Sequence, residues 1–261
     1  MRKKFIMWKQ HIADQKTGLR RGRTPFDPAR PSLLCVHGAG GRGQGFLPQL
    51  SGLSSEINVA AIDLPGHGQT PGPSCERIED YAHWLADFLQ AGPLRPVLLG
   101  HSMGGAIAMT LALEHPGLLR GLVLVGTGAK LGVLPAILDG LLQDFAATVK
   151  MIVAYAYAPD ADPLLLEQGG QNMSQIPPPV VHGDFSACNH FDIRERLHDI
   201  RMPVQIIVGD QDRLSPPRYA EYLKEHLPQA RLSIIPGAGH MVHLEKHRET
   251  NQAVLDFMAG L

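Results

Sequence analysis

Short apolar runs without polar alternation are the feature that most constrains how this 261-residue chain can fold. A strand with one solvent-facing side alternates apolar and polar side chains, whereas a strand buried on both faces does not. Each run leads into turn residues, and the gaps between runs leave room for helices. The runs occupy residues 32–36, 57–62, 97–99, 122–125 and 204–208, and a further strand is expected at 231–235.

Helical periodicity appears in the segments between these runs. Apolar side chains recur at i, i+3, i+4 and i+7 spacing over residues 78–89 and again over 254–261. Strands and helices that alternate in this way predict an α/β fold, with a doubly wound and mostly parallel sheet. Right-handed crossovers then bring the carboxyl ends of the strands to one edge, where ligands bind.

One stretch interrupts the alternation. Residues 130–199 contain no buried-strand run, and they are too many for a plain loop. Residues 134–157 have an apolar helical pattern, and Ile-Pro-Pro-Pro at 176–179 predicts a rigid extended piece. We therefore expect a core formed by residues 1–129 and 200–261, with residues 130–199 inserted as a helical cap.

Composition excludes several classes of protein. The chain is 44% hydrophobic and 19% charged with a net charge of −1, which is typical of a globular domain and leaves no basic footprint for nucleic acid. We interpret the basic cluster Arg20, Arg21 and Arg23 as a solvated turn. The apolar stretch at 121–138 is broken by Lys130, glycines and Pro135, so no membrane span is expected.

Cysteine usage favours a reducing compartment. Cys35, Cys75 and Cys188 are odd in number and form no Cys-x-x-Cys pair, so a disulfide scaffold is not expected. No apolar run of signal-peptide length follows Lys3 and Lys4. We predict a soluble, cytoplasmic protein.

The segment Gly100-His-Ser-Met-Gly104 matches the Gly-x-Ser-x-Gly nucleophile elbow, and it lies directly between a predicted strand and a predicted helix. A serine on such a turn has its hydroxyl pushed out at the sheet edge, and the flanking glycines relieve backbone crowding. The alternative is an ordinary helix N-cap serine. Because strand, glycines and helix are all in place, Ser102 is the candidate nucleophile.

A serine hydroxyl needs a base, and a histidine base needs an acid that fixes its tautomer. His240 lies in a glycine-rich loop between the last strand and the last helix, at the catalytic edge. Among the 13 histidines, His37, His67 and His101 are interpreted as loop hydrogen-bonders. His243 and His247 are expected at the exposed start of the last helix.

Two aspartates follow the strand at 204–208. Asp212 is far enough from the strand end to reach the histidine loop, whereas Asp210 is beside the strand end and is interpreted as a turn former or helix cap. The loop after the strand at 122–125 has no carboxylate. The predicted triad is therefore Ser102, Asp212 and His240.

Backbone N–H groups should stabilise the oxyanion. One donor is the N–H of Met103, which follows the nucleophile. The second should come from the glycine-rich loop at 37–41, with Ala39 the first choice and Gly40 the second. This loop lacks the Lys-Ser/Thr of a phosphate-binding loop.

A cluster in the cap contains residue types that can bind metals. It lacks a paired histidine motif or a cysteine cluster, so we interpret it as structural hydrogen bonding within the cap and expect no metal or other cofactor. A substrate contact from one of its members stays open. The cluster comprises His182, Asp184, Asn189, His190 and Asp192.

Five motifs in this order resemble the α/β-hydrolase superfamily, and most of all its small capped esterases, lactonases, haloperoxidase-like proteins and carbon–carbon bond hydrolases. Serine at position 102 argues against the haloalkane dehalogenases and epoxide hydrolases, which use aspartate there. His-Gly-Ala-Gly-Gly also lacks the third consecutive glycine of the hormone-sensitive-lipase branch. The motifs are Val36-His-Gly-Ala-Gly-Gly41, Asp63-Leu-Pro-Gly-His-Gly68, Gly100-His-Ser-Met-Gly-Gly105, Gly209-Asp-Gln-Asp212 and Gly239-His240.

The sequence thus predicts a serine hydrolase that cleaves a small or medium carboxylic ester through an acyl-enzyme on Ser102. A lactone, a thioester or a vinylogous diketone would use the same triad, and a non-catalytic ligand receptor is the alternative outside the enzymes. Apolar cap residues, such as Leu134, Phe145, Met151 and Tyr155, predict a preference for uncharged acyl groups.

Overall fold

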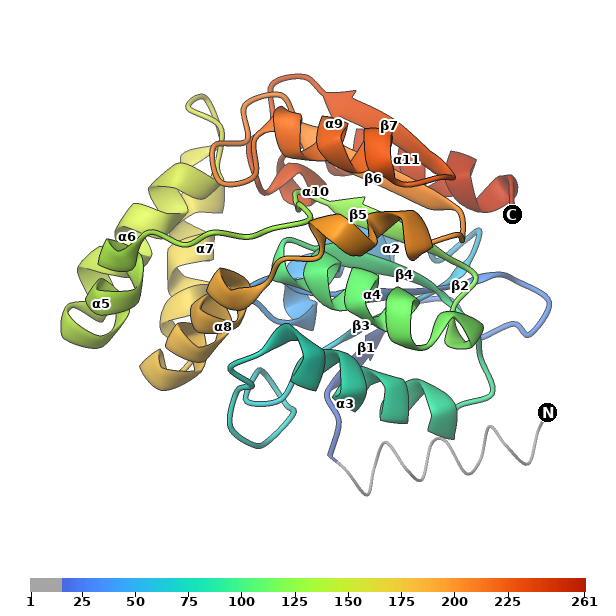
Figure 1. Ribbon diagram of the computed structural model, residues 1–261, viewed down its shortest axis with the longest axis horizontal. Helices are drawn as coiled ribbons and strands as arrows, with labels where there is room; N and C mark the ends of the chain where they lie inside the picture. The colour runs from blue at the N-terminus through green and yellow to red at the C-terminus, as the bar shows by residue number, and fades with distance from the viewer. Residues whose placement is uncertain (1–15) are drawn as a thin grey trace.

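A computed structural model describes residues 16–261, so the first fifteen residues of the predicted core lie outside the described part. A seven-stranded sheet runs through the molecule in the order β1-β3-β2-β4-β5-β6-β7 (Figure 1). All neighbouring strands are parallel except β1 and β3. The predicted α/β class with a mostly parallel sheet is confirmed. The strands are β1 Leu19–Arg21, β2 Ser32–Val36, β3 Asn58–Ile62, β4 Val97–His101, β5 Gly121–Val125, β6 Val204–Gly209 and β7 Ala230–Ile235.

The interpretation of the basic cluster as a turn was wrong, because two of its three arginines lie in strand β1. Arg20 and Arg21 pair with Ala61 and Ala60 in an antiparallel edge strand, and only Arg23 lies beyond it. An edge strand needs no buried apolar run, and charged side chains on an edge discourage pairing with other chains.

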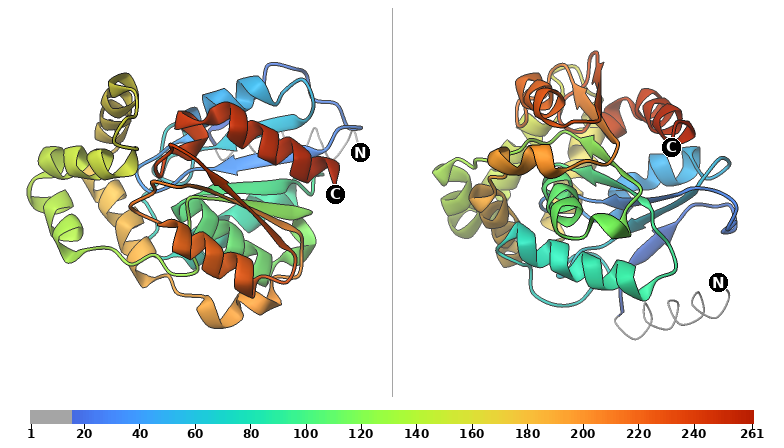
Figure 2. Two further views of the ribbon diagram at one scale, coloured as in Figure 1. Left: turned by 90° about the horizontal axis from the view of Figure 1, so that it is seen from above. Right: turned by 45° about the vertical axis from the view of Figure 1, so that its right-hand side comes forward.

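Helices cover both faces of the sheet (Figure 2). On one face, α3 (Ile78–Ala91), α4 (Met103–Glu114) and α9 (Pro217–His226) pack against the strands in one apolar cluster. On the other, α2 (Leu47–Gly52) and α11 (His247–Ala259) do the same. The short helices η1 (Gly43–Phe46), η2 (Pro116–Leu118) and α10 (Val242–Glu245) complete the loops. The sheet is therefore the rigid platform of the molecule.

Between β5 and β6, four helices gather at one end of the sheet (Figure 1). They pack on one another through two small apolar clusters of their own. No helix within residues 16–261 is long and apolar enough to cross a membrane. The elements are α5 Pro135–Gln143, α6 Phe145–Ala156, α7 Pro163–Ser174 and α8 Pro178–His190, followed by η3 Arg194–Asp199.

The prediction of an extended piece at 176–179 was wrong in its second half. Pro178 and Pro179 form the first turn of α8, and Pro177 stands at its N-cap. The first backbone N–H groups of a helix have no intrahelical acceptor, so proline loses no hydrogen bond there. A proline run can thus begin a helix as readily as it can stay extended.

Candidate active site

Ser102 lies on a strained turn between β4 and α4, with φ 53° and ψ −117°. Its N–H donates to the carbonyl of Val125 (2.9 Å), and its carbonyl accepts from Oγ1 of Thr127 (2.9 Å). A side chain on Gly100 would overlap the backbone of Gly104. The sheet neighbours and the glycines together hold a conformation that a serine rarely adopts.

The predicted acid and base are in contact. Nδ1 of His240 donates to Oδ2 of Asp212 at 2.9 Å, and both residues are buried. Because Nδ1 carries the proton in this bond, Nε2 is left as the basic nitrogen. Asp210 is exposed and instead accepts the N–H of Gly237 at 2.7 Å, so it closes the turn beside the strand end.

Further donors surround the Asp212 carboxylate. The N–H groups of Leu214 and Ser215 donate to Oδ1 at 2.9 and 2.8 Å. The Ser215 hydroxyl donates to Oδ2 (2.8 Å) and lies 3.1 Å from Nδ1 of His240, where it can also accept. Sequence reasoning missed Ser215, although its place three residues after an aspartate is the signal of such a turn.

The pKa of Asp212 is lowered despite its burial. Burial alone would raise this pKa, but the electrostatic interaction with His240 and the hydrogen bonds from His240 and Ser215 outweigh it. The carboxylate therefore stays ionised, as an acid that orients a histidine requires.

Two further histidines beside the site, His37 and His101, are buried. Burial and neighbouring imidazoles lower the pKa of His37 and of His101 well below the usual value. His101 donates from Nε2 to the carbonyl of His240 at 3.1 Å, and His37 accepts the N–H of Leu64 (3.1 Å). Their predicted role as hydrogen-bonders agrees with these contacts.

The prediction for His243 was wrong, because this residue is buried on α10 rather than exposed. Its ring packs against Phe46 and His101, with centroids 5.2 and 4.4 Å away. Burial and the electrostatic interaction with His240 lower its pKa to about 3. His247 begins α11 and is exposed, as expected.

The loop at 37–41 forms a tight turn in which the N–H of Gly41 donates to the carbonyl of Gly38 at 3.0 Å. Gly40 has φ +62°, the left-handed conformation that glycine adopts most readily. Its N–H donates to Oδ2 of Asp184 on α8 at 2.8 Å, so this N–H is occupied. Of the two sequence candidates, Ala39 is left, and Met103 begins α4 with an N–H in the helix's unpaired first turn.

A cavity of about 430 Å³ brings Ser102, His240 and Ala39 together beneath the four helices. Among the four cap residues singled out from the sequence, Leu134, Met151 and Tyr155 line it. Phe145 instead packs within the apolar clusters of the inserted helices. Most of the lining is apolar, and Arg42 and Arg213 are its cationic members.

Hydrogen bonds tie the inserted helices to the histidine loop. Glu245 on α10 accepts the N–H of Gly239 (3.0 Å) with one oxygen and the N–H of Ala158 (2.9 Å) with the other. The N–H of Met241 donates to the carbonyl of Ala156 at 3.1 Å. The end of α6 and the segment after it are thus joined to the histidine loop and to α10.

Comparison with known proteins identifies the family of the chain. The alpha/beta hydrolase fold family matches residues 31–247. A pimeloyl-(acyl-carrier protein) methyl ester esterase of Aromatoleum aromaticum is 31% identical over 254 residues, which cover 88% of this chain and 99% of the relative. The chain belongs to the alpha/beta hydrolase fold family. The family resemblance inferred from the five motifs is confirmed.

Solved structures of the family superimpose on nearly the whole chain. A thermophilic esterase has a TM-score of 0.83 at 35% identity, covering 94% of this chain and 93% of that one. The enol-lactonase from Burkholderia xenovorans LB400 has a TM-score of 0.85 at 21% identity, covering 93% and 96%, and shares the fold. The prediction of a serine hydrolase of the esterase type is likewise confirmed.

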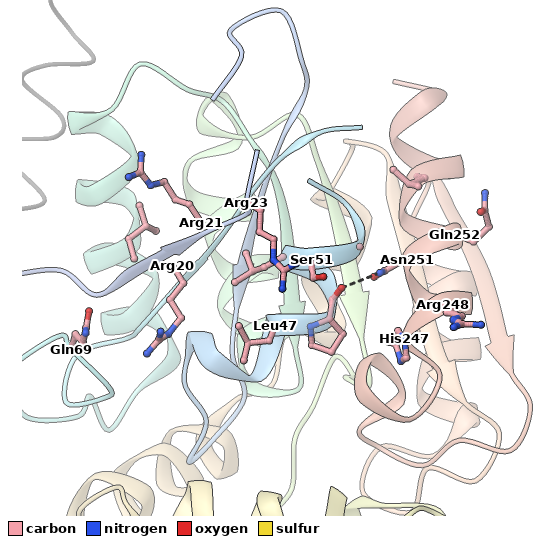
Figure 3. A pocket seen from close by; sticks show the side chains of 15 residues that line it. Arg20, Arg21, Arg23, Leu47, Ser51, Gln69, His247, Arg248, Asn251 and Gln252 are labelled. Atoms are coloured by element: carbon pink, nitrogen blue, oxygen red, sulfur yellow. Dashed lines mark hydrogen bonds between the residues drawn. The ribbon is translucent and has the colours of Figure 1, made fainter. Parts of the chain in front are cut away.

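A second, larger cavity of about 1040 Å³ lies away from the inserted helices of this hydrolase (Figure 3). Figure 3 shows Arg20, Arg21 and Arg23 along its β1 side and His247 and Arg248 on α11. None of the predicted triad lines it. The larger cavity is therefore not the one that Ser102 and His240 line.

The metal-capable cluster in the cap does not behave as a unit. Within residues 16–261 no group of three or more histidine, cysteine, aspartate or glutamate side chains could hold a metal ion. Asp192 pairs with Arg194 (2.7 Å) and Lys130 (3.3 Å). The expectation of hydrogen bonding within the cap was wrong for Asp184. Its partners His67, Tyr81 and Gly40 all belong to the core.

Proposed function

We propose that this hydrolase cleaves a small or medium carboxylic ester through an acyl-enzyme on Ser102. Ser102 attacks the carbonyl carbon while Nε2 of His240 takes its proton and Asp212 orients the ring. The alcohol leaves with that proton, and a water activated by His240 then releases the acid. The observation that carries the proposal is the buried Asp212–His240 pair beside the cavity that Ser102 lines.

The developing oxyanion is stabilised by the N–H groups of Ala39 and Met103. Engagement of the Gly40 N–H by Asp184 favours Ala39 as the donor from the loop. Donors that are fixed before the reaction need no reorganisation as charge develops, which is why such sites accelerate acyl transfer strongly.

Substrate preference follows from the cavity. Residues 130–199 act as a cap whose apolar side chains, among them Met151 and Tyr155, contact the acyl group. A largely apolar lining favours uncharged acyl chains. The relative from Aromatoleum aromaticum is named for a methyl ester, which supports a small alcohol as the leaving group here.

The substrate is a small molecule, no nucleic acid partner is involved, and the enzyme works in the cytoplasm. The pI of about 6.9 supports the second statement. Cys35, Cys75 and Cys188 are all free thiols, which supports a reducing compartment.

A substrate panel tests the proposal. We expect kcat/KM to be highest for p-nitrophenyl and methyl esters of neutral acids, and lower for lactones, thioesters and vinylogous diketones. An organophosphonate should label Ser102 in the wild-type protein. Higher kcat/KM on any of the other three classes would reassign the substrate. Binding of esters without turnover would instead identify a ligand receptor.

A further inference from the structure

Asp184 is a fully buried carboxylate that projects from α8 into the core and has no part in the proposed proton transfers. Oδ2 accepts from the Gly40 N–H (2.8 Å) and from Nε2 of His67 (2.8 Å), and Oδ1 accepts from the Tyr81 hydroxyl (2.5 Å). Three donors from three separate core segments thus converge on one side chain.

His67 compensates the buried negative charge. Its Nδ1 donates to the carbonyl of Pro65 at 2.9 Å, so both ring nitrogens donate and the ring is an imidazolium. Burial lowers the pKa of His67, but the charge and hydrogen bond of Asp184 outweigh burial and raise it overall. A buried pair of this kind is kept only when its remaining hydrogen-bonding groups are satisfied.

The turn at 38–41 shows what this carboxylate can control. In a four-residue turn closed by a bond between its first and last residues, the central peptide can take two orientations, and positive φ at the third residue marks one of them. Here that peptide joins Ala39 and Gly40, and glycine itself imposes little preference. The carboxylate accepts the N–H of this peptide, and a reversed peptide would point the Ala39 carbonyl at the negative charge.

We propose that Asp184 is a positioning residue: its hydrogen bond to the Gly40 N–H holds the turn at 38–41 in one conformation and anchors it to α8. This anchor keeps the backbone of Ala39, whose own N–H lies in the adjoining Gly38–Ala39 peptide, in place as an oxyanion donor. This inference rests on the proposed function. It assigns the cap a second task besides contacting the acyl group: α8 must be docked for the oxyanion site on the core to be complete.

The test compares two substitutions at Asp184. In Asp184→Asn, the amide oxygen can still accept from Gly40 and His67, and the amide nitrogen can donate to the Tyr81 hydroxyl, which can rotate to accept. In Asp184→Leu, the acceptor is lost in a similar volume. We expect Asp184→Leu to lose about 10- to 100-fold in kcat on a p-nitrophenyl ester, with KM changed by less than about 3-fold. Asp184→Asn should recover most of that loss.

A second measurement separates oxyanion binding from general damage. A trifluoromethyl ketone forms a tetrahedral adduct with the active serine, so its affinity should fall in Asp184→Leu by the same factor as kcat. Because the leucine leaves the His67 charge unpaired, the double variant with His67→Leu provides a form without that buried charge. The double variant should show the same kcat loss.

Three results would overturn the inference: equal kcat in folded Asp184→Leu and wild type, a loss confined to KM, or unchanged ketone affinity. Failure of the proposed function is distinguishable, because it shows in the wild-type protein as no labelling of Ser102 by an organophosphonate or as no turnover of the p-nitrophenyl ester.

Discussion

Two buried aspartate–histidine pairs in this protein have almost the same contact distance and different proposed uses. Oδ2 of Asp212 lies 2.9 Å from Nδ1 of His240, and Oδ2 of Asp184 lies 2.8 Å from Nε2 of His67. Both ring nitrogens of His67 form hydrogen bonds. In His240, Nδ1 bonds to Asp212, and the residue lines the cavity that Ser102 also lines. The contact alone therefore does not identify a catalytic pair. What distinguishes them is a second nitrogen available beside a nucleophile.

Substitution of Ser102 should have the largest effect, because Asp212 and His240 can be a catalytic pair only if Ser102 is the nucleophile that they serve. Ser102→Ala should lower kcat/KM by about 10⁴- to 10⁶-fold on a p-nitrophenyl ester. Ser51→Ala, a serine in the second cavity, is the matched control and should keep full activity. Esterase activity that survives in Ser102→Ala would remove the assignment.

Substitution of Asp212, the proposed acid of the catalytic pair, should have the second-largest effect. Asp212→Asn should leave the fold intact and lower kcat by about 10²- to 10⁴-fold, because His240 loses the carboxylate that selects its tautomer. Asp210→Asn changes an exposed turn carboxylate and should cost far less. Steady-state kinetics with circular dichroism spectra of both variants will check this. A larger loss in folded Asp210→Asn would mean that the carboxylates were assigned the wrong way round.

Cap substitutions should alter which esters are accepted. Tyr155→Ala and Met151→Ala enlarge the apolar lining, so kcat/KM should shift by about 10- to 100-fold toward longer acyl chains. Leu164→Ala, an exposed cap leucine outside the cavity, should leave the chain-length profile unchanged. If the profile moved only with substitutions on the core loops, the cap would not determine specificity.

The smallest expected effect is on the pH dependence of stability, where a paired and an unpaired histidine differ in sign. His243 has a pKa of about 3 when folded and about 6.5 when unfolded, so it costs stability as pH falls below 6.5, by about 2 kcal/mol at pH 5. The raised pKa of His67 has the opposite consequence, because its stabilisation is present below pH 6.5 and is lost as pH rises through the folded pKa.

Urea unfolding of two variants will measure this difference. His243→Phe should lose less stability than wild type between pH 7.5 and 5. His67→Gln should lose less than wild type as pH rises above 6.5. The same pH dependence in His243→Phe and wild type would contradict a neutral buried imidazole.

The features that could be predicted from the sequence are those that a local pattern of residues encodes. Strands buried on both faces have an unmistakable composition, and the elbow around Ser102 requires glycines at fixed positions. Strand β1 was not predicted, because it is a three-residue edge strand with two arginines. His243 was misplaced because its spacing from His240 and His247 suggested one helix, whereas α10 ends at Glu245 and a second helix begins at His247.

Asp184 lay beyond sequence reasoning for a different reason. Its partner Gly40 is 144 residues away, and no spacing rule joins a cap helix to a core loop. In the sequence it is only one of several polar residues near the end of the cap. Long-range hydrogen bonds depend on how two finished parts dock, which periodicity does not describe.

The hydrogen bonds of Glu245 and Met241 have a consequence for how substrate enters. To swing away as one body, the inserted helices would have to break these bonds together with those of Asp184. At about 1–3 kcal/mol each, such an opening approaches the free energy of unfolding a whole domain. By the proposal for Asp184, it would also release the turn at 38–41 from α8. We therefore expect substrate to enter through small local movements of the inserted helices rather than through their displacement as one body.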